Sequence, residues 1–328
     1  MDILLTGSVA YDYLMIFPGH FKEQILPERL ESISLSFLVD GMTKQRGGIA
    51  PNIAYTMALL GERPRVMATV GEDFGDYRNW LESKGVDTSL MKVIPGEFTA
   101  SFFATTDRAS AQIASFYPGA MAHAATQSLK ELNKKPDLVI VSPSAPDAMK
   151  KFPAECRELG IPYLYDPSQQ VLRLEGHELA RDMEGAQFLF CNDYEFGLIS
   201  KKTGWSLDQI LEHVKVLVIT RGKDGADLYV GGDAVHIPTV PEDEIVDPTG
   251  VGDAFRGGFL AGYSRGFDWK LCGEIGSLAA VYCLEQKGTQ SHHYTIREFI
   301  ERFRKHFDDG GKLDRLLDGV QRPEGFGV

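Results

Sequence analysis

Asp247-Pro-Thr-Gly-Val-Gly-Asp-Ala-Phe-Arg-Gly-Gly-Phe259 is the stretch that decides the fold of this chain. Two glycines, Gly250 and Gly252, stand directly before the carboxylate of Asp253, and an apolar, helix-compatible run follows. Glycines at a helix start let backbone N–H groups point into one small space, which carries the positive end of the helix dipole. A carboxylate beside such an anion hole fits a base that deprotonates a hydroxyl group while the hole holds the phosphoryl group under attack.

Two plainer interpretations of this stretch also fit its spacing. A dinucleotide-binding fingerprint needs a third glycine where Phe255 stands, so that match is broken. A loop that ends in an ordinary helix cap would also place an aspartate at Asp253, because aspartate is common at helix starts. The spacing alone leaves phosphate chemistry and a plain capped loop equally open.

Length and charge limit the class of protein. The chain has 328 residues, enough for one large α/β domain with a small subdomain, and a net charge of −12. Nucleic acids and anionic membranes bind basic surfaces, so neither is an expected partner. No apolar run approaches membrane-spanning length, and the start at Met1 lacks the basic region of a signal peptide. Four cysteines without C-x-x-C spacing predict reduced thiols and a cytoplasmic location: Cys156, Cys191, Cys272 and Cys283.

Apolar runs alternate with helical segments along most of the chain. Strands are predicted at 3–6, 65–70, 137–141, 161–165, 187–190 and 214–220, and helices at 51–60 and 77–84. This alternation predicts an α/β fold with a mostly parallel sheet covered by helices. Ligands are then expected at the carboxyl ends of the strands.

Several segments depart from the alternation. Residues 30–39 and 98–116 are rich in Ser, Thr, Phe and β-branched residues, which predicts antiparallel strands outside the main sheet, with surface hairpins as the alternative. The polar segment after Lys312 is expected to be partly mobile. His292 and His293 lack a third metal ligand spaced nearby, and we expect them in a solvated loop.

The quoted stretch resembles the C-terminal signature of the ribokinase-like (PfkB) carbohydrate kinase family. Gly47-Gly48-Ile-Ala-Pro-Asn52-Ile-Ala54 is similar to the N-terminal signature, and Asn192-Asp-Tyr-Glu195 is similar to the N-x-x-E element. The three elements occur in the family's order over nearly the whole chain. Val251 and Pro248 depart from the commoner family residues, which indicates a subgroup rather than a lost activity, because the glycines and the aspartate are present.

The resemblance implies a ribokinase-like α/β fold, with a mostly parallel central sheet flanked by helices and a small β-sheet lid. It implies a single kinase domain over residues 1–328, with a lid built from about residues 12–40 and 98–116. Asp253 would be the catalytic base, and the N–H groups of Gly250, Val251 and Gly252 would stabilise the transferred phosphoryl group. The cofactor would be ATP with Mg²⁺.

Polar residues after the first predicted strand suit a ribose. Ser8 and Asp12 follow that strand, and a carboxylate can accept two hydrogen bonds from a vicinal diol. Gly48 permits close approach of a ligand to the backbone, and the Asn52 amide can both donate and accept. A lone aspartate near a strand end is more often a turn residue, so the sugar interpretation depends on the family positions of these residues.

Aromatic residues of the predicted lid bear on the rest of the acceptor. Phe102, Phe103 and Phe116 could stack on a nucleobase, although phenylalanines at strand spacing more often lie in a core. Residues 35–40, 112–121, 166–170 and 203–205 together resemble the bacterial adenosine kinase branch more than ribokinase itself. This resemblance implies ribose contacts from Ser8, Asp12, Gly48 and Asn52, and adenine contacts from Ser36, Phe102, Phe116, Gln169 and Gln170.

The phosphate donor is expected in the C-terminal half. Asn192 and Glu195 follow a predicted strand and could hold Mg²⁺ through water, although a helix capping box explains the same pair. The resemblance implies that Thr220, Gly222 and Gly225 line the ATP site. The chain has no G-x-x-x-x-G-K-[ST] motif, so a P-loop enzyme is not expected.

A monovalent cation is a further implication of the resemblance. Asp247 and Thr249, with the backbone near Gly288, match the family positions that bind one. The ion would be potassium, and the sequence leaves its use by this chain open.

The resemblance thus predicts an adenosine kinase of purine salvage, which converts ATP and adenosine into ADP and AMP. A ribokinase-like sugar kinase is the alternative within the fold, and a non-catalytic nucleotide-binding sensor is the alternative outside enzymes. The intact Asp253 and its glycines favour an enzyme. Two copies are expected to form a homodimer by covering the apolar faces of their lids.

Overall fold

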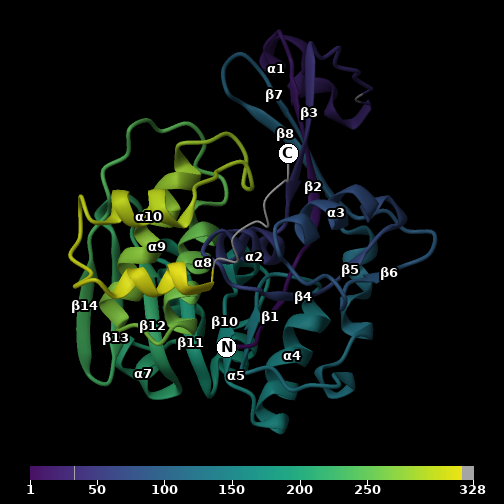
Figure 1. Ribbon diagram of the computed structural model, residues 1–328. Coiled ribbons are helices and arrows are strands. Elements are labelled where there is room, and N and C mark those ends of the chain that lie inside the picture. The colour runs from purple at the N-terminus through teal and green to yellow at the C-terminus, as the bar shows by residue number, and fades with distance from the viewer. Residues whose placement is uncertain (33, 320–328) are drawn as a thin grey trace, which may run out of the picture.

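The computed structural model describes residues 1–32 and 34–319. In this part of the chain, eight strands form the central sheet in the order β14-β13-β12-β11-β10-β9-β1-β4 (Figure 1). They are β1 (Ile3–Thr6), β4 (Arg65–Met67), β9 (Leu138–Val141), β10 (Tyr163–Tyr165), β11 (Ala186–Asn192), β12 (Val214–Thr220), β13 (Ala226–Val230) and β14 (Asp233–Ile237). Neighbours from β4 to β12 pair in parallel, whereas β13 and β14 pair antiparallel. The predicted mostly parallel α/β sheet is confirmed.

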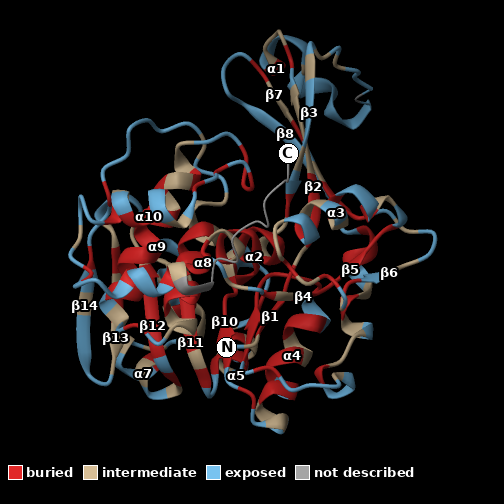
Figure 2. Cartoon of the chain, in the orientation of Figure 1, coloured by how far each residue is buried: buried red, intermediate tan, exposed pale blue. Residues whose placement is uncertain are grey.

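Helices cover both faces of this sheet, and the sheet lies at the buried centre (Figure 2). One face packs against α2 (Ile49–Leu59), α3 (Gly75–Ser83), α8 (Val251–Ser264), α9 (Trp269–Leu284) and α10 (Ile296–Phe303). The other face packs against α4 (Pro146–Leu159), α5 (Gly176–Met183), α6 (Asp193–Thr203) and α7 (Leu207–His213). Successive residues of β1 alternate between the two cores, since Ile3 and Leu5 join one core and Leu4 the other. Burial on both faces explains why the strands are continuous apolar runs in the sequence.

A second, smaller sheet projects from the main body and forms the lid, at the top right of Figure 1. In the described residues its order is β3-β2-β7-β8, with β2 (Ala10–Ile16), β3 (Gly41–Gly47), β7 (Ala100–Thr106) and β8 (Gln112–Tyr117). Strand β2 pairs antiparallel with β3 and parallel with β7, and β7 pairs antiparallel with β8. The prediction of strands within 98–116 is therefore confirmed.

The predicted strand over residues 30–39 is wrong. The 3₁₀ helix η1 (Pro27–Ser32) ends there, and residues 34–39 have no regular structure. The edge strand is β3 instead, whose polar, glycine-ended sequence Gly-Met-Thr-Lys-Gln-Arg-Gly carries little strand signal. The short helix α1 (Phe21–Gln24) lies between β2 and η1.

The structure also bears on two expectations for the C-terminal part of the chain, the environment of His292 and the segment after Lys312. His292 is buried, contrary to the predicted solvated loop, and its Nε2 lies 3.2 Å from Thr56 Oγ1. Burial lowers the pKa of His292 to about 4, so the imidazole is neutral. After Lys312 the chain forms the 3₁₀ helix η7 (Lys312–Gly319), and the expected mobile end, residues 320–328, lies outside the described residues.

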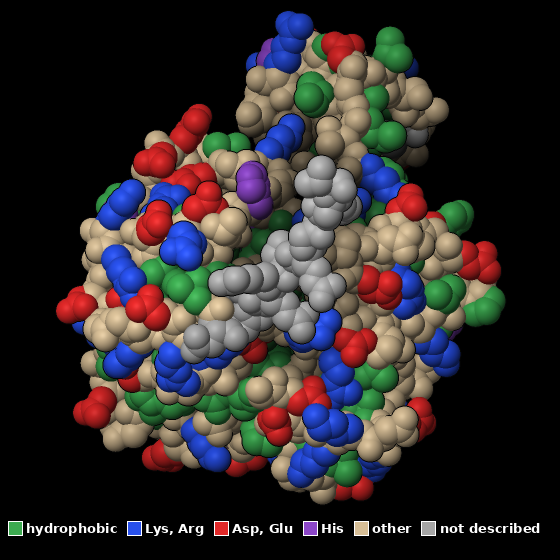
Figure 3. Space-filling view, viewed as in Figure 1, with side chains coloured by type: hydrophobic (Ala, Val, Ile, Leu, Met, Phe, Trp, Pro, Cys, Tyr) green, Lys and Arg blue, Asp and Glu red, His purple; other side chains and the backbone are tan. Residues whose placement is uncertain are grey.

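The four cysteines of the chain are all buried. Burial raises the pKa of all four thiols, which are free: Cys156, Cys191, Cys272 and Cys283. Within the described ranges, none of the helices combines the length and apolar character needed to cross a bilayer. Acidic and basic side chains are interspersed over the face of the described residues in Figure 3.

Candidate active site

Residues from distant parts of the sequence meet at the carboxyl ends of β1, β11 and β12, where helix α8 begins. They line a cavity of about 420 Å³. Its lining includes most of the predicted residues: Ser8, Asp12, Gly48, Asn52, Phe102, Phe116, Gln169, Asn192, Glu195, Thr220, Thr249, Gly250, Gly252 and Asp253. The structure therefore gathers the acceptor, donor and catalytic predictions in one place.

The start of α8 has the geometry of an anion site. Gly250 has a φ of 80°, a left-handed conformation, and a Cβ there would lie 2.8 Å from Thr289 Cγ2. At Gly252 a Cβ would lie 2.9 Å from Nη1 of Arg256. A side chain is excluded at Gly250, whereas at Gly252 it would require the Arg256 guanidinium to shift. The first N–H groups of a helix have no carbonyl partner within it, and Gly250 and Gly252 at the start of α8 line this cavity.

Asp253 lies in the first turn of α8, on the cavity wall. Asn52 Nδ2 donates a hydrogen bond of 2.8 Å to Asp253 Oδ2. Burial raises the pKa of Asp253 to about 7, although the Arg256 charge and the bond from Asn52 lower it. A carboxylate with a pKa near neutrality is well suited to accept a proton from a hydroxyl group.

Sequence reasoning missed a buried ion pair beside Asp253. Arg256, one turn further along α8, contacts Asp166 through Nη2–Oδ1 at 2.8 Å and Nε–Oδ2 at 2.7 Å. Burial raises the pKa of Asp166 to about 6, and the arginine opposes this shift. The signal was present in the quoted stretch, since Arg256 is a charged residue inside an otherwise apolar run.

The lid supplies one wall of the cavity. Asp12 of β2 lies opposite Phe102 of β7, which lies opposite Phe116 of β8. Directly paired residues share a face of a sheet, so these three side chains face the cavity together. Burial and the nearby charge of Asp247 raise the pKa of Asp12 to about 6.

The loop between the lid and α2 needs glycine at position 48. Gly48 has a φ of 96°, and a Cβ there would lie 2.5 Å from the carbonyl oxygen of Ser8. The Ser8 hydroxyl accepts a hydrogen bond of 3.2 Å from Ile49 N, at the start of α2. This close approach holds α2, and with it Asn52, against the end of β1.

An apolar hollow of about 810 Å³ continues the cavity past the lid. The two share Ser8, Phe102, Phe116 and Gln169. The wall of the hollow adds mostly apolar residues: Pro118, Met121, Ala122, Pro143, Ala145 and Pro146. Gln170 is buried in this wall. Its Nε2 donates 3.2 Å to Ser144 O, whereas its Oε1 has no partner among the described residues.

Five predicted residues lie outside the lining of both cavities. Ser36 is exposed in the loop between η1 and β3. Gly222 and Gly225 form the turn around the 3₁₀ helix η6 (Gly222–Asp224) after β12, both with positive φ. Val251 is the first residue of α8. Asp247 lies before the helix, with its carboxylate bonded to Thr249 N at 2.9 Å and Gly288 N at 3.0 Å.

The proposed magnesium residues form the capping box that was the alternative explanation. Asn192 Oδ1 accepts a bond of 2.7 Å from Glu195 N, and Asn192 N donates 2.9 Å to Glu195 Oε2. Both residues also line the cavity. Across the described ranges, no three His, Cys, Asp or Glu side chains are grouped to hold a metal. An amide and a carboxylate on the cavity wall fit an ion such as Mg²⁺, which keeps its waters and takes few protein ligands.

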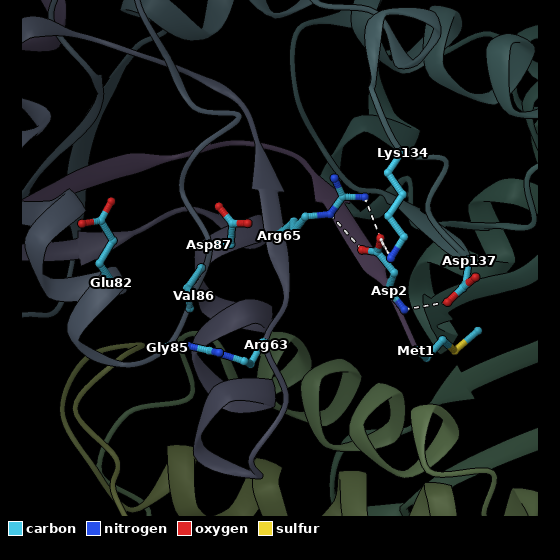
Figure 4. Close-up of a pocket in the computed structure, with 10 residues that line it drawn as sticks. All are labelled: Met1, Asp2, Arg63, Arg65, Glu82, Gly85, Val86, Asp87, Lys134 and Asp137. Atoms are coloured by element: carbon cyan, nitrogen blue, oxygen red, sulfur yellow. Dashed lines mark hydrogen bonds and ion pairs between the residues drawn. The ribbon is translucent and has the colours of Figure 1, made fainter. Parts of the chain in front are cut away.

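A separate hollow of about 800 Å³ lies at the opposite edge of the sheet, near the start of β1 and β4 (Figure 4). Its charges are largely paired with each other. Asp2 contacts Arg65 at 2.8 Å and Lys134 at 3.2 Å, and Asp2 N donates to Asp137 at 2.7 Å. This hollow is far from the strand ends at which the predicted catalytic residues lie.

Comparison with known proteins agrees with this geometry. The sequence profile of the pfkB family carbohydrate kinases matches residues 6–295. The chain belongs to the pfkB family. It is therefore an ATP-dependent kinase with a ribokinase-like fold.

Nucleoside kinases are among the similar members of the pfkB family. The nucleoside kinase of Methanothermobacter thermautotrophicus is 32% identical over 306 residues, which are 92% of this chain and 95% of that protein. The ligand-free nucleoside kinase of Burkholderia thailandensis is 39% identical with a TM-score of 0.84, over 92% of this chain and all of that one (100%). Its complex with inosine has 37% identity and a TM-score of 0.82, over 93% and 98%.

Replacement of the proposed base is a direct test of the site. Asp253→Asn is expected to lower kcat by about 10²–10⁴-fold, the usual contribution of a positioned base, with little change in the KM for ATP. ADP release with a saturating acceptor measures both constants. Asp208→Asn at the start of α7 is the matched control and should leave turnover unchanged. Near wild-type turnover in folded Asp253→Asn would show that Asp253 is not the base.

The raised pKa of Asp253, the predicted base, implies a pH profile for this pfkB kinase. Only ionised Asp253 can accept a proton, and burial raises its pKa to about 7. We therefore expect kcat/KM to fall about tenfold per pH unit as the pH drops below about 7. This fall is the acidic limb of the pH profile, and an aspartate with an ordinary pKa would place it near pH 4. A profile flat down to pH 5 would contradict the assignment.

Proposed function

We propose that this kinase phosphorylates the 5′-hydroxyl of a purine nucleoside, with adenosine as the first candidate and AMP as its product in purine salvage. The supporting observation is that the acceptor cavity has two continuous halves. The half next to Asp253 is polar, and the half beyond Phe102 and Phe116 is apolar. A nucleoside has the same division between its ribose and its base.

The polar half suits the ribose. The Asp12 carboxylate can accept hydrogen bonds from the 2′- and 3′-hydroxyl groups, and Gly48 leaves the backbone accessible. Although burial raises the pKa of Asp12 to about 6, this carboxylate is still mostly ionised and able to accept at pH 7. The 5′-hydroxyl of a ribose held there would extend toward Asp253.

The apolar half suits a purine. Phe102 and Phe116 share one face of the lid sheet and can stack on a base. The buried Oε1 of Gln170 needs a donor, and either the 6-amino group of adenine or the N1–H of hypoxanthine offers one. The Burkholderia thailandensis kinase in complex with inosine supports purine nucleosides as a class.

The proposed chemistry assigns one task to each element. Asp253 takes the 5′-hydroxyl proton as that oxygen attacks the γ-phosphorus, and the bond from this phosphorus to the oxygen of ADP breaks. The N–H groups of Gly250, Val251 and Gly252 stabilise the charge on the transferred group. Asn192 and Glu195 would hold Mg²⁺ through water, and the ion would neutralise charge on the donor phosphates.

The ATP site and a potassium site belong to the same proposal. The turn after β12 would hold ATP. It contains Gly222 and Gly225 and follows Thr220, which lines the cavity. The carboxylate of Asp247 and the carbonyl of Thr249 are hard oxygen donors of the kind that bind potassium.

A ribokinase-like sugar kinase is the second candidate. The polar half alone would hold a pentose, and the catalytic residues would act in the same way. The apolar hollow would then have no ligand group to cover it. Acceptor preference separates the two candidates.

A panel of acceptors tests the proposal. We expect the wild type to turn over adenosine and inosine with a higher kcat/KM than ribose or fructose. Phe116→Ala should raise the KM for adenosine, because stacking contributes about 1–3 kcal/mol per base. Phe103→Ala is the matched control, since Phe103 lies on the opposite face of the lid and stacks on Tyr13 at 4.9 Å. Preference for a free sugar would instead establish the second candidate.

We also propose a homodimer through the lid. The lid exposes large apolar side chains, including Met42 of β3 (65% exposed), Ile16 of β2 (59%) and Leu38 in the irregular segment before β3 (84%). A small sheet with bare apolar residues is marginal in water, and a second copy can cover it about a two-fold axis.

Light scattering at micromolar concentration tests this assembly. The wild type should have twice the chain mass, and Met42→Glu should halve it, because the substitution buries a charge in the interface. Glu62→Gln, in the loop after α2, is a control that should leave the mass unchanged. A wild-type monomer under these conditions would refute the dimer.

A further inference from the structure

A chain of side-chain hydrogen bonds leads from the surface of α3 to the proposed base, and it uses residues that the reaction does not otherwise involve. It begins at Trp80 of α3, whose Nε1 donates 3.3 Å to Gln290 Oε1. Gln290, in the loop after α9, donates through Nε2 to Asn52 Oδ1 at 2.9 Å. Asn52 donates through Nδ2 to Asp253 Oδ2 at 2.8 Å. Four separate segments of the chain are thus linked by hydrogen bonds that end at the Asp253 carboxylate.

The direction of this chain is fixed at its outer end. An indole N–H can only donate, so the amide oxygen of Gln290 must face Trp80. Its NH₂ group then faces Asn52, whose own oxygen must accept. The NH₂ group of Asn52 is left to face Asp253.

A second contact fixes the same direction. Tyr77 donates its hydroxyl hydrogen to the carbonyl of Gly47 at 2.9 Å, so its oxygen is free to accept. The second hydrogen of Gln290 Nε2 points to that oxygen. A reversed Gln290 amide would place its oxygen against Asn52 and Tyr77 and its NH₂ against the indole N–H.

Burial makes this direction matter. Asn52, Gln290 and Tyr77 are 4%, 6% and 0% exposed, so water has little access to replace a lost partner. Trp80 is held in place by its ring, which stacks on Tyr55 at 6.1 Å and lies under the Arg46 guanidinium at 4.6 Å.

We propose that Trp80 and Gln290 are positioning residues that fix Asn52 as a hydrogen-bond donor to Asp253, and so keep that carboxylate ionised and turned toward the acceptor hydroxyl. With Asn52 reversed, two oxygens would face each other unless Asp253 carried a proton, and a protonated Asp253 is no base. The donated bond also holds Oδ2 and leaves Oδ1 for the hydroxyl proton. This inference rests on the proposed role of Asp253 as the base.

Other groups near Asp253 influence its charge from several elements. They are Arg256 of the same helix, Asp166 after β10, Glu195 of α6 and Cys283 of α9. Among the described residues, none of these groups is hydrogen-bonded to the side chain of Trp80 or Gln290. Differences between variants therefore report the hydrogen-bond chain.

Trp80→Phe and Gln290→Met test the proposal in the full-length kinase with ATP and its best acceptor. Each variant should move the acidic limb of the kcat/KM profile to higher pH. For Gln290→Met the expected shift is about one pH unit, which corresponds to the free energy lost with a hydrogen bond to a charged group. The KM for ATP should stay constant, and turnover should recover at high pH. The double variant should match Gln290→Met alone, because Trp80 acts through Gln290.

Trp205→Phe is the matched control for the loss of an indole. Trp205 stacks on His213 at 4.1 Å, far from Asp253, and its substitution should leave the limb in place. A melting curve for each variant reports folding. If Gln290→Met does not fold, Trp80→Phe alone decides, since phenylalanine keeps the aromatic stacking.

Three outcomes would overturn the proposal. They are an unmoved limb in the folded variants, an equal loss of kcat at every pH, and additive shifts in the double variant. Failure of the base assignment has a different signature, because Asp253→Asn would then retain turnover and the wild type would lack the limb near pH 7.

Discussion

The contact between helices α2 and α8 is the constraint on which the site depends. A Cβ at Gly257 would lie 2.6 Å from Thr56 Cβ and 2.8 Å from Ile53 O, so the two helices meet at a position that excludes any side chain. Thr56 and Gly257 each lie four residues, about one helical turn, after Asn52 and Asp253. The same close contact therefore brings the amide of Asn52 to the carboxylate of Asp253. Gly258 fixes the other side of α8, where a Cβ would lie 2.8 Å from Ile275 O of α9.

Electrostatics at the site follow from this burial. Asp12, Asp166 and Asp253 all have a raised pKa because each carboxylate is withdrawn from water. Arg256 offsets part of this negative charge, but Asp166 already pairs with it. An acidic site that receives the phosphates of ATP must neutralise them by other means. In the proposed function, the N–H groups at the start of α8 and a magnesium ion would supply that charge without a basic surface.

The sequence predicted the parts of this architecture that depend on local signals. The buried strands are continuous apolar runs, and glycine is needed at position 250 because its φ is positive. The lid edge was misplaced because β3 is polar and is a strand only through its pairing with β2. The burial of His292 and the partners of Arg256 and Gln290 depend on contacts between segments more than 80 residues apart, such as Arg256 with Asp166 (90 residues) and Gln290 with Asn52 (238 residues). No local pattern records such contacts.

The division of the site between two sheets separates acceptor choice from chemistry. Asp253 and the proposed anion hole lie on α8, which is wedged between α2 and α9 in the main core. The side chains proposed to face the acceptor, Asp12, Phe102 and Phe116, lie on the lid, whose strand β8 is exposed along its whole length. A substitution on the lid alters packing against few core residues, whereas one on α8 disturbs three helices. Changes in the lid can therefore alter the acceptor while the phosphoryl-transfer machinery stays intact, which accounts physically for a single family fold serving both sugars and nucleosides.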